Sequence, residues 1–171
     1  ELRAWAKWCL TGDSCTFEGG YCHTCGKPER EPWPETWMTI AHIVAGRSYD
    51  PRLQVGAIVV SEDNTQMLSM GYNGNFRGGS HVPESLEPGQ SGFIHAEANA
   101  LIKCDFNFPK KKHMYVTAMP CRACAKLIVN AEISQVVYHH PYRLTEGVDL
   151  LRSVGIRVLS LTEAIEQACG R

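Results

Sequence analysis

Apolar and polar positions alternate with clear periods over most of the chain. The first periodic set has the spacing of one helix face and consists of Trp37, Ile40, Ala41 and Val44. This set predicts a helix over residues 35–46. Two short apolar runs follow at residues 54–60 and 67–72, separated by a polar turn at residues 61–64. Runs of this length with a turn between them are typical of paired strands.

Strands and helices alternate after a long Gly- and Pro-rich loop, residues 73–94. A loop of this length in a compact domain is usually functional or mobile. The remaining strands are predicted at residues 114–117, 136–138 and 156–160. The remaining helices are predicted at residues 95–104, 121–131, 145–153 and from 162 onwards. The order predicts an α/β fold, with a mixed sheet of about five strands covered by helices on both faces.

Composition changes near residue 35, and the change suggests two parts. Residues 35–171 carry the periodic pattern, whereas residues 1–34 form a Cys-rich N-terminal segment with little apolar material. The cysteines of this segment are Cys9, Cys15, Cys22 and Cys25. A structural zinc knuckle held by these four thiolates would fold such a segment, so we predict a second, structural Zn²⁺ there. The alternative is a disordered or disulfide-linked appendage.

Four residues have the types and the spacing of a catalytic metal site. His95 and Glu97 are followed, after the predicted strand 114–117, by Cys121 and Cys124. This is the H-x-E and P-C-x-x-C pattern of zinc deaminases. Two thiolates and one imidazole occupy three positions of a tetrahedral zinc ion and leave the fourth for water.

Glu97 is the predicted catalytic residue because it lies two positions from His95 on the same predicted helix. From there it could reach the zinc-bound water without ligating the metal, and could act as general acid and base. Each of these residues alone would be better interpreted as a cap, a core thiol or a solvated charge. The complete set predicts a hydrolytic deaminase.

Charge and hydropathy restrict the partners. Lysine and arginine number 17 and aspartate and glutamate 18, a balance that argues against nucleic acid as the partner. There is no apolar run of about 18 residues, so no membrane span is predicted. No signal peptide is recognised, and pairs of cysteines with metal-binding spacing suit a reducing compartment, so the cytoplasm is predicted.

Several segments resemble one branch of a known superfamily. They are Arg47–Pro51, Gln54–Val60, Gly71–Gly74, His95–Leu101, Met114–Thr117 and Pro120–Ile128. Together they are similar to the deoxycytidylate (dCMP) deaminase branch of the cytidine deaminase-like zinc deaminases. The resemblance covers nearly three quarters of the chain. Unlike many members of that branch, this chain has no cysteine between Cys25 and Cys104 that could hold a further zinc in the long loop.

The resemblance implies a three-layer α/β/α sandwich, one catalytic zinc and conversion of dCMP to dUMP with release of ammonia. It also implies a small-molecule nucleotide as the substrate and a homo-oligomer as the assembly. By motif position, Asn73 would bind the sugar or base and the Ala96 backbone would meet the pyrimidine edge. Arg47 and Ser48 would face the phosphate. Tyr142 fits the family pattern too and would line the site.

Two classes of alternative function remain open. The first is a deaminase of another substrate, namely dCTP, a nucleoside, a free base or a base within nucleic acid. The second is a non-catalytic, zinc-folded binding protein. Glu97 separates the second class from the enzymes, because a binding module has no use for a carboxylate beside an open metal position.

Overall fold

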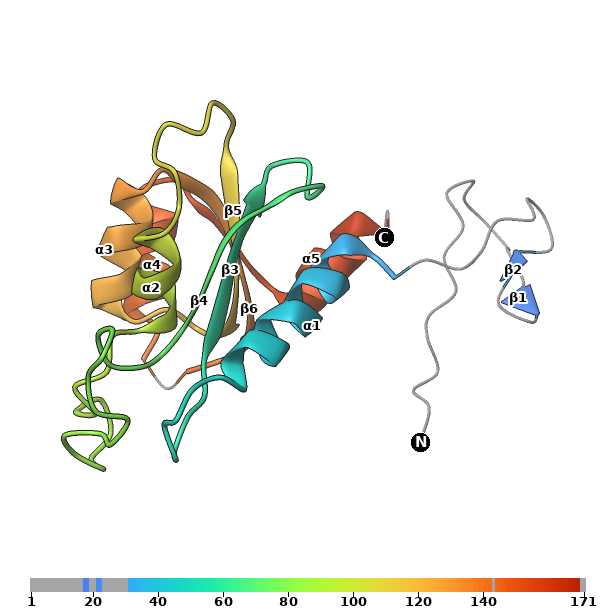
Figure 1. Cartoon of the computed structure of the whole chain (residues 1–171). Coiled ribbons are helices and arrows are strands. Elements are labelled where there is room, and N and C mark those ends of the chain that lie inside the picture. The colour runs from blue at the N-terminus through green and yellow to red at the C-terminus, as the bar shows by residue number, and fades with distance from the viewer. Residues whose placement is uncertain (1–16, 19–20, 23–30, 143, 170–171) are drawn as a thin grey trace.

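The computed structural model describes residues 17–18, 21–22, 31–142 and 144–169, with the backbone alone in the first two short segments. Those two segments are strands β1 (Phe17–Glu18) and β2 (Tyr21–Cys22), which pair antiparallel. All other elements belong to one α/β body (Figure 1). None of the helices in the described part of the chain is long and apolar enough to cross a membrane.

A mixed five-stranded sheet forms the middle of this body, in the order β4-β3-β5-β6-β7. Its strands are β3 (Gly56–Ser61), β4 (Met67–Tyr72), β5 (Lys112–Ala118), β6 (Ile133–His140) and β7 (Arg157–Ser160). Strand β3 pairs antiparallel with both β4 and β5, whereas β5, β6 and β7 run parallel. The carboxyl ends of β5 and β6 therefore lie side by side at one edge of the sheet.

Helices cover both faces of the sheet. They are α1 (Trp33–Ala45), α2 (Ala96–Leu101), α3 (Arg122–Asn130), α4 (Glu146–Ser153) and α5 (Leu161–Ala168). Figure 1 shows α1 and α5 together on one face and α2, α3 and α4 on the other. This arrangement confirms the predicted three-layer sandwich with about five strands.

Two hydrophobic cores fill the spaces between the layers. Alternate residues of β3 divide between them: Ile58 and Val60 face α1, whereas Ala57 and Val59 face α2. All four side chains are buried. Because a strand points successive side chains to opposite faces, a strand covered on both sides must be apolar at every position. This is why the strand appears in the sequence as an unbroken apolar run.

Two glycines let the helices of one face approach the chain closely. A Cβ atom built on Gly71 of β4 would lie 2.4 Å from the Ala96 carbonyl oxygen and from the Ala100 amide nitrogen of α2. A Cβ atom on Gly147 of α4 would lie 2.1 Å from the Pro120 carbonyl oxygen, just before α3. Such distances exclude any side chain. Glycine at these positions therefore fixes where α2 and α3 begin.

Element boundaries differ from the predictions at several ends. Helix α2 ends at Leu101 instead of residue 104, and the next residue, Ile102, is 76% exposed. Strand β6 extends to His140, beyond the predicted residue 138. Helix α1 begins at Trp33, two residues before the predicted start, because Pro34 fits the first turn of a helix. The boundary proposed at residues 34 and 35 therefore falls inside a helix.

Candidate active site

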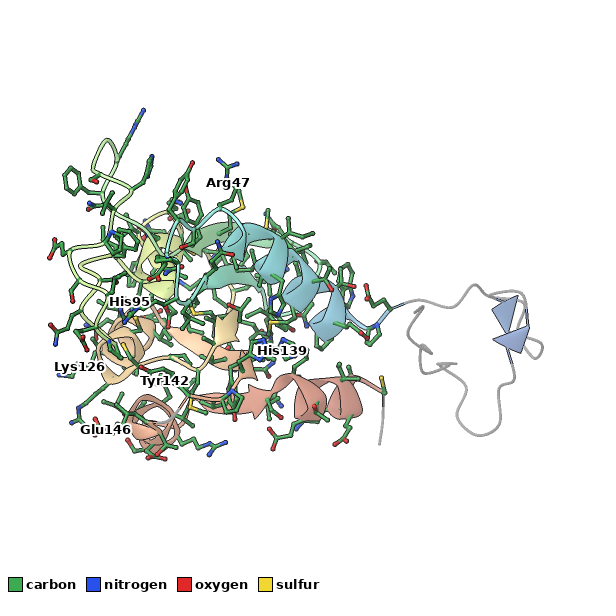
Figure 2. All side chains as sticks on the ribbon, turned by 90° about the horizontal axis from the view of Figure 1, so that it is seen from below. Arg47, His95, Lys126, His139, Tyr142 and Glu146 are labelled. Atoms are coloured by element: carbon green, nitrogen blue, oxygen red, sulfur yellow. The ribbon has the colours of Figure 1, made fainter. Side chains whose placement is uncertain are left out.

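Two helix starts converge at the carboxyl edge of the sheet. His95 is the N-cap of α2 and Cys121 is the N-cap of α3, and both have extended backbone conformations. Cys124 lies in the first turn of α3, where its backbone N–H donates to the Cys121 sulfur at 3.5 Å. Figure 2 shows His95 beside α3. The ligand atoms of His95, Cys121 and Cys124 all lie within 4.8 Å of one another.

The distances within this group suit a zinc ion. The His95 Nδ1 atom lies 3.5 Å from the Cys121 sulfur and 3.3 Å from the Cys124 sulfur. Zn–S and Zn–N bonds of ordinary length at the tetrahedral angle would separate nitrogen and sulfur by about 3.6 Å. The group contains three residues in the part of the chain that the structure describes, so it leaves one tetrahedral position open. This is the composition of a catalytic zinc site.

Hydrogen bonds prepare the sulfurs for a cation. Hydrogen bonds from Cys124 and then from His95 lower the pKa of the Cys121 thiol to about 3, which favours its thiolate form. The Cys124 thiol shares a proton with this thiolate, and its pKa is raised accordingly. The hydrogen bond between His95 and Cys121 raises the pKa of His95. A divalent ion would replace the protons that hold the three side chains together.

Glu97 lies in the first turn of α2 and is 4% exposed. Burial raises the pKa of its carboxyl group, and its contacts with the backbone, His95 and Cys124 offset only part of that shift. Its carboxyl group is close enough to Cys124 to interact with it, yet it is not part of the three-residue ligand group. A buried carboxyl beside an open metal position can accept and return a proton.

Asn73 is buried, and its side chain is bonded to the chain itself. The carboxamide oxygen accepts from the Val55 N–H at 2.8 Å, and the amide nitrogen donates to the Leu53 carbonyl at 2.9 Å and to Asp50 at 3.3 Å. Asn73 therefore holds the segment between α1 and β3 in place. Its predicted contact with the sugar or base stays a prediction.

The other predicted substrate residues differ in position. Ser48 is buried and its hydroxyl accepts from the Asp50 N–H, as in a tight turn. Arg47 is exposed, and in Figure 2 its side chain points outward, away from His95. Ala96 is fully buried at the start of α2, directly after His95. Tyr142 is half-buried on the loop after β6.

Sequence reasoning missed two residues that support the site. Asp50 is 5% exposed, and its carboxylate accepts from the Arg52 and Leu53 N–H groups as well as from Asn73. Asn99 of α2 donates to the Tyr72 carbonyl at 2.9 Å and ties α2 to the end of β4. Both lie inside segments on which the family resemblance rested, but nothing in the pattern around them indicated these bonds.

The predicted structural zinc site lies outside the described residues. Cys9, Cys15 and Cys25 are not described, and only the backbone of Cys22 is. The described cysteines outside the ligand group are Cys104 and Cys169, and both are partly buried. The structure therefore leaves the N-terminal zinc as a prediction.

Comparison with known proteins identifies the family. Residues 31–140 match the family described as the cytidine and deoxycytidylate deaminase zinc-binding region. This match contains the whole ligand group and Glu97. The chain belongs to this deaminase family. The family's zinc-binding region supports a catalytic Zn²⁺ in this deaminase, and the ligand group of α2 and α3 fits that ion.

Relatives of the deaminase occur in bacteria and animals. ComE operon protein 2 of Bacillus subtilis is 37% identical over 137 residues, which cover 76% of this chain and 71% of that protein. Human deoxycytidylate deaminase is 37% identical over 114 residues, 62% of this chain and 64% of the human protein. Mouse deoxycytidylate deaminase is 34% identical over 143 residues, 76% of this chain and 80% of the mouse protein.

A solved structure shares the fold. The dCMP deaminase of cyanophage S-TIM5, in complex with dCMP and dUMP, superposes with a TM-score of 0.63 at 33% identity and covers 74% of this chain and 94% of the phage chain. A diaminohydroxyphosphoribosylaminopyrimidine deaminase/reductase from Thermotoga maritima superposes with a TM-score of 0.58 at 25% identity, over 81% of this chain and 39% of that one. The same fold thus occurs in deaminases that are named for different pyrimidine substrates.

Proposed function

We propose that this chain is a zinc-dependent hydrolase that converts dCMP to dUMP and releases ammonia. The observation that carries the proposal is the buried Glu97 beside a ligand group that leaves one zinc position open. The deoxycytidylate deaminases of human and mouse are relatives, and the phage relative was solved with dCMP and dUMP. All three support a cytosine nucleotide as the substrate.

His95, Cys121 and Cys124 would hold the zinc ion. Two thiolates and one imidazole carry two negative charges in total, so their complex with Zn²⁺ would be formally neutral. When bound, zinc supplies an acidic water molecule close to neutral pH. The ligands sit on helix starts that are fixed by the sheet and by the close approaches at Gly71 and Gly147, so the open position faces a constant direction.

Glu97 moves the protons of the reaction. Its carboxylate accepts a proton from the attacking water and delivers it to the N3 atom of the cytosine ring. A second transfer through the same carboxyl group protonates the amino group that leaves C4 as ammonia. The balance is one dCMP and one water consumed for one dUMP and one ammonia formed. Burial keeps the carboxyl group away from bulk water, which favours these transfers over exchange with solvent.

A deaminase of a cytosine nucleoside or free base is the second candidate. Arg47 points away from His95, and residues 88–93 of the long loop contain no basic side chain that could meet a phosphate. This observation favours a substrate without phosphate. The relatives that are named for deoxycytidylate favour the nucleotide, and we give them more weight because they match over most of this chain.

We also infer a homo-oligomer in the cytoplasm. The long loop exposes three large apolar side chains, Phe76 at 65%, Val82 at 71% and Leu86 at 65%. Large apolar side chains exposed along one loop support an interface between subunits there. Zinc-binding thiols require a reducing compartment, which is the basis for placing the protein in the cytoplasm.

An ammonia-release screen tests the proposed substrate. The zinc-loaded protein is incubated separately with dCMP, dCTP, deoxycytidine, cytidine, cytosine, guanine and single-stranded DNA, and kcat/KM is measured for each. We expect dCMP to give the highest value, by at least tenfold over deoxycytidine. The control is a Cys121→Ser variant, which loses a zinc ligand and should release no ammonia from any compound. A highest value for deoxycytidine or cytosine would instead establish the second candidate.

A further inference from the structure

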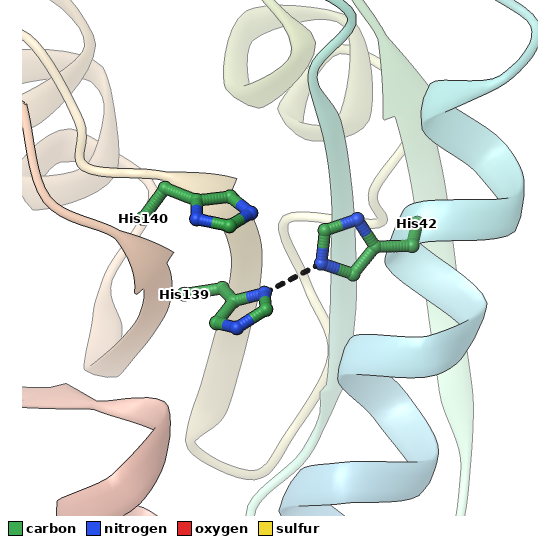
Figure 3. A group of neighbouring side chains, drawn as sticks. All are labelled: His42, His139 and His140. Atoms are coloured by element: carbon green, nitrogen blue, oxygen red, sulfur yellow. Dashed lines mark hydrogen bonds between the residues drawn. The ribbon is translucent and has the colours of Figure 1, made fainter. Parts of the chain in front are cut away.

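Three histidines that the deaminase reaction does not use gather on the surface. His42 comes from the exposed side of α1, and His139 and His140 come from the end of β6. Their ligand atoms lie within 4.8 Å of one another, and all three residues are exposed. Figure 3 shows the rings of His139 and His140 turned toward the ring of His42. We call this group the three-histidine cluster.

The arrangement of the rings is unusual for a strand. Successive residues of a regular strand point to opposite faces, so His139 and His140 would be expected to diverge. Instead their rings stack, with 4.1 Å between the ring centroids and an interplanar angle of 29°. His42 meets both edge-on, with ring centroids 5.0 Å from His139 and 5.7 Å from His140. Three imidazoles from two separate elements therefore converge on one point.

We propose that the three-histidine cluster is a second metal site, which binds a divalent transition-metal ion such as Zn²⁺. Imidazole nitrogen is a common ligand of Zn²⁺, Cu²⁺ and Ni²⁺, and three imidazoles are enough to hold such an ion with solvent in the remaining positions. The exposure of the cluster gives an ion direct access from solution. The proposal is independent of the substrate proposed above.

The distances need only a small adjustment. The Nε2 atom of His42 lies 2.7 Å from the Nδ1 atom of His139. Metal–nitrogen bonds of ordinary length place two ligand nitrogens about 3.0 to 3.4 Å apart, depending on the coordination geometry. A ring rotation that opens this pair by less than an ångström would admit an ion. One proton is shared between the two nitrogens without a metal, and the ion would replace it.

The cluster differs chemically from the catalytic ligand group. It offers three neutral nitrogens and no thiolate, so the bound ion would keep its full charge and be held less tightly than at two cysteines. Weaker and exposed binding makes this an exchangeable site.

The position of the cluster links it to the strand that leads to Cys121. His140 is paired with Ala118 of β5, and its carbonyl accepts from the Met119 N–H at 2.9 Å, two residues before Cys121. An ion held by His42 and His140 would therefore link α1 to the carboxyl end of β6, close to the start of α3. We expect the bound ion to stabilise the fold.

Calorimetric titration with Zn²⁺ tests the site. The full-length protein keeps its catalytic zinc and is first dialysed against a weak chelator. We expect one added equivalent of Zn²⁺ to bind, and the affinity to fall at least tenfold in His42→Ala and in His140→Gln. Deamination should persist in both variants. Added Zn²⁺ should raise the melting temperature of the wild type but not that of the variants.

Two controls separate the three-histidine cluster from other places on the chain where Zn²⁺ could bind. His81→Ala removes another exposed histidine, and Cys22→Ser with Cys25→Ser removes thiolates of the predicted N-terminal zinc site; neither change should affect the added equivalent. If the wild type binds no added Zn²⁺, the proposal is wrong. It is equally wrong if the equivalent persists in both histidine variants or is lost only with the cysteines.

Discussion

At the scale of single residues, Glu97 is unusual because an acidic side chain is seldom fully buried. It is 4% exposed, and burial raises the pKa of its carboxyl group. Burial of a carboxyl group costs free energy unless the group is hydrogen-bonded, paired or protonated. The salt bridges of the described residues involve exposed lysines elsewhere, at Asp63 and Glu62. The proposed acid–base role would account for the buried position of Glu97.

Glu97→Gln tests this role with almost no change in shape. The amide can neither accept the water proton nor return one, so we expect kcat to fall by at least ~100-fold, the usual scale for a general acid–base group. Zinc content by elemental analysis should stay at the wild-type level, because Glu97 is not a ligand. Glu166→Gln, on the exposed side of α5, is the matched control. Wild-type turnover in Glu97→Gln would remove the assigned role.

The sequence indicated the proposed metal ligands more clearly than the proposed substrate contacts. Metal ligands need fixed residue types at fixed spacings, so His95, Cys121 and Cys124 were visible as a pattern, and the structure places them together. Asn73 shows the limit. Its three hydrogen bonds reach back about 20 residues to the segment before β3, and no local spacing indicates such partners. Family position indicated that Asn73 matters, but the internal bonds were not predictable.

At the scale of elements, the site depends on how closely α2 lies against β4. There is no room for a side chain between Gly71 and the backbone of α2, and Asn99 fastens the same helix to the Tyr72 carbonyl. The helix has six residues and would not be stable alone. Packing against the sheet therefore determines where His95 and Glu97 lie.

Gly71→Ala should damage both stability and the metal site. The added methyl group would meet backbone atoms at 2.4 Å, which cannot move aside as a flexible side chain could. We expect the free energy of unfolding to fall by about 2 kcal/mol or more, as for other overpacked sites. Bound zinc and kcat should fall as well, because α2 is displaced. Gly74→Ala is the control, since its nearest neighbour would be a Tyr72 ring atom at 3.6 Å. Equal stability of the two variants would contradict this view of the packing.

The turn between β3 and β4 carries a pH-dependent contact. Asp63 accepts from the Ser61 hydroxyl and from the Thr65 N–H and hydroxyl, and these bonds, the one from Ser61 first, lower its pKa from 3.8 to about 2. A lowered pKa means that the folded chain binds the proton less readily than the unfolded one. The contribution of Asp63 to stability is therefore complete above pH 3.8 and disappears as the pH falls through about 2.

Asp63→Asn should show the loss of this stability between pH 3.8 and about 2. We expect the variant to be less stable than the wild type near neutral pH, and the difference to shrink as the pH is lowered toward 2, measured by urea denaturation at a series of pH values. Glu62→Gln is the control. Its partner Lys111 is 4.0 Å away and both side chains are largely exposed, so little stability should be lost. A difference between Asp63→Asn and the wild type that does not depend on pH would contradict the assignment.

At the scale of the whole molecule, the fold is predictable because the apolar residues of the strands contribute to both hydrophobic cores. Strand β3 is apolar at almost every position, and this pattern already requires a sheet with helices on both faces. The edges of the elements were less predictable. Strand β6 continues into two exposed histidines, which have no apolar signal, so the carboxyl end of the sheet extends further than the pattern indicated.

The two cores also predict what removal of zinc does to the whole chain. The ion would join the starts of α2 and α3, but the apolar layers of both faces do not depend on it. We therefore expect the protein treated with a strong chelator to remain folded at 25 °C, by circular dichroism, with a clearly lower melting temperature. At a free zinc concentration about a thousand times the dissociation constant, the ion would contribute about 4 kcal/mol. Cys124→Ser should melt at the lowered temperature with or without chelator, because it has already lost a ligand. Unfolding of the wild type on chelation would mean that the sheet and its two cores cannot support the fold without the metal, and an unchanged melting temperature would mean that no ion joins the two helix starts.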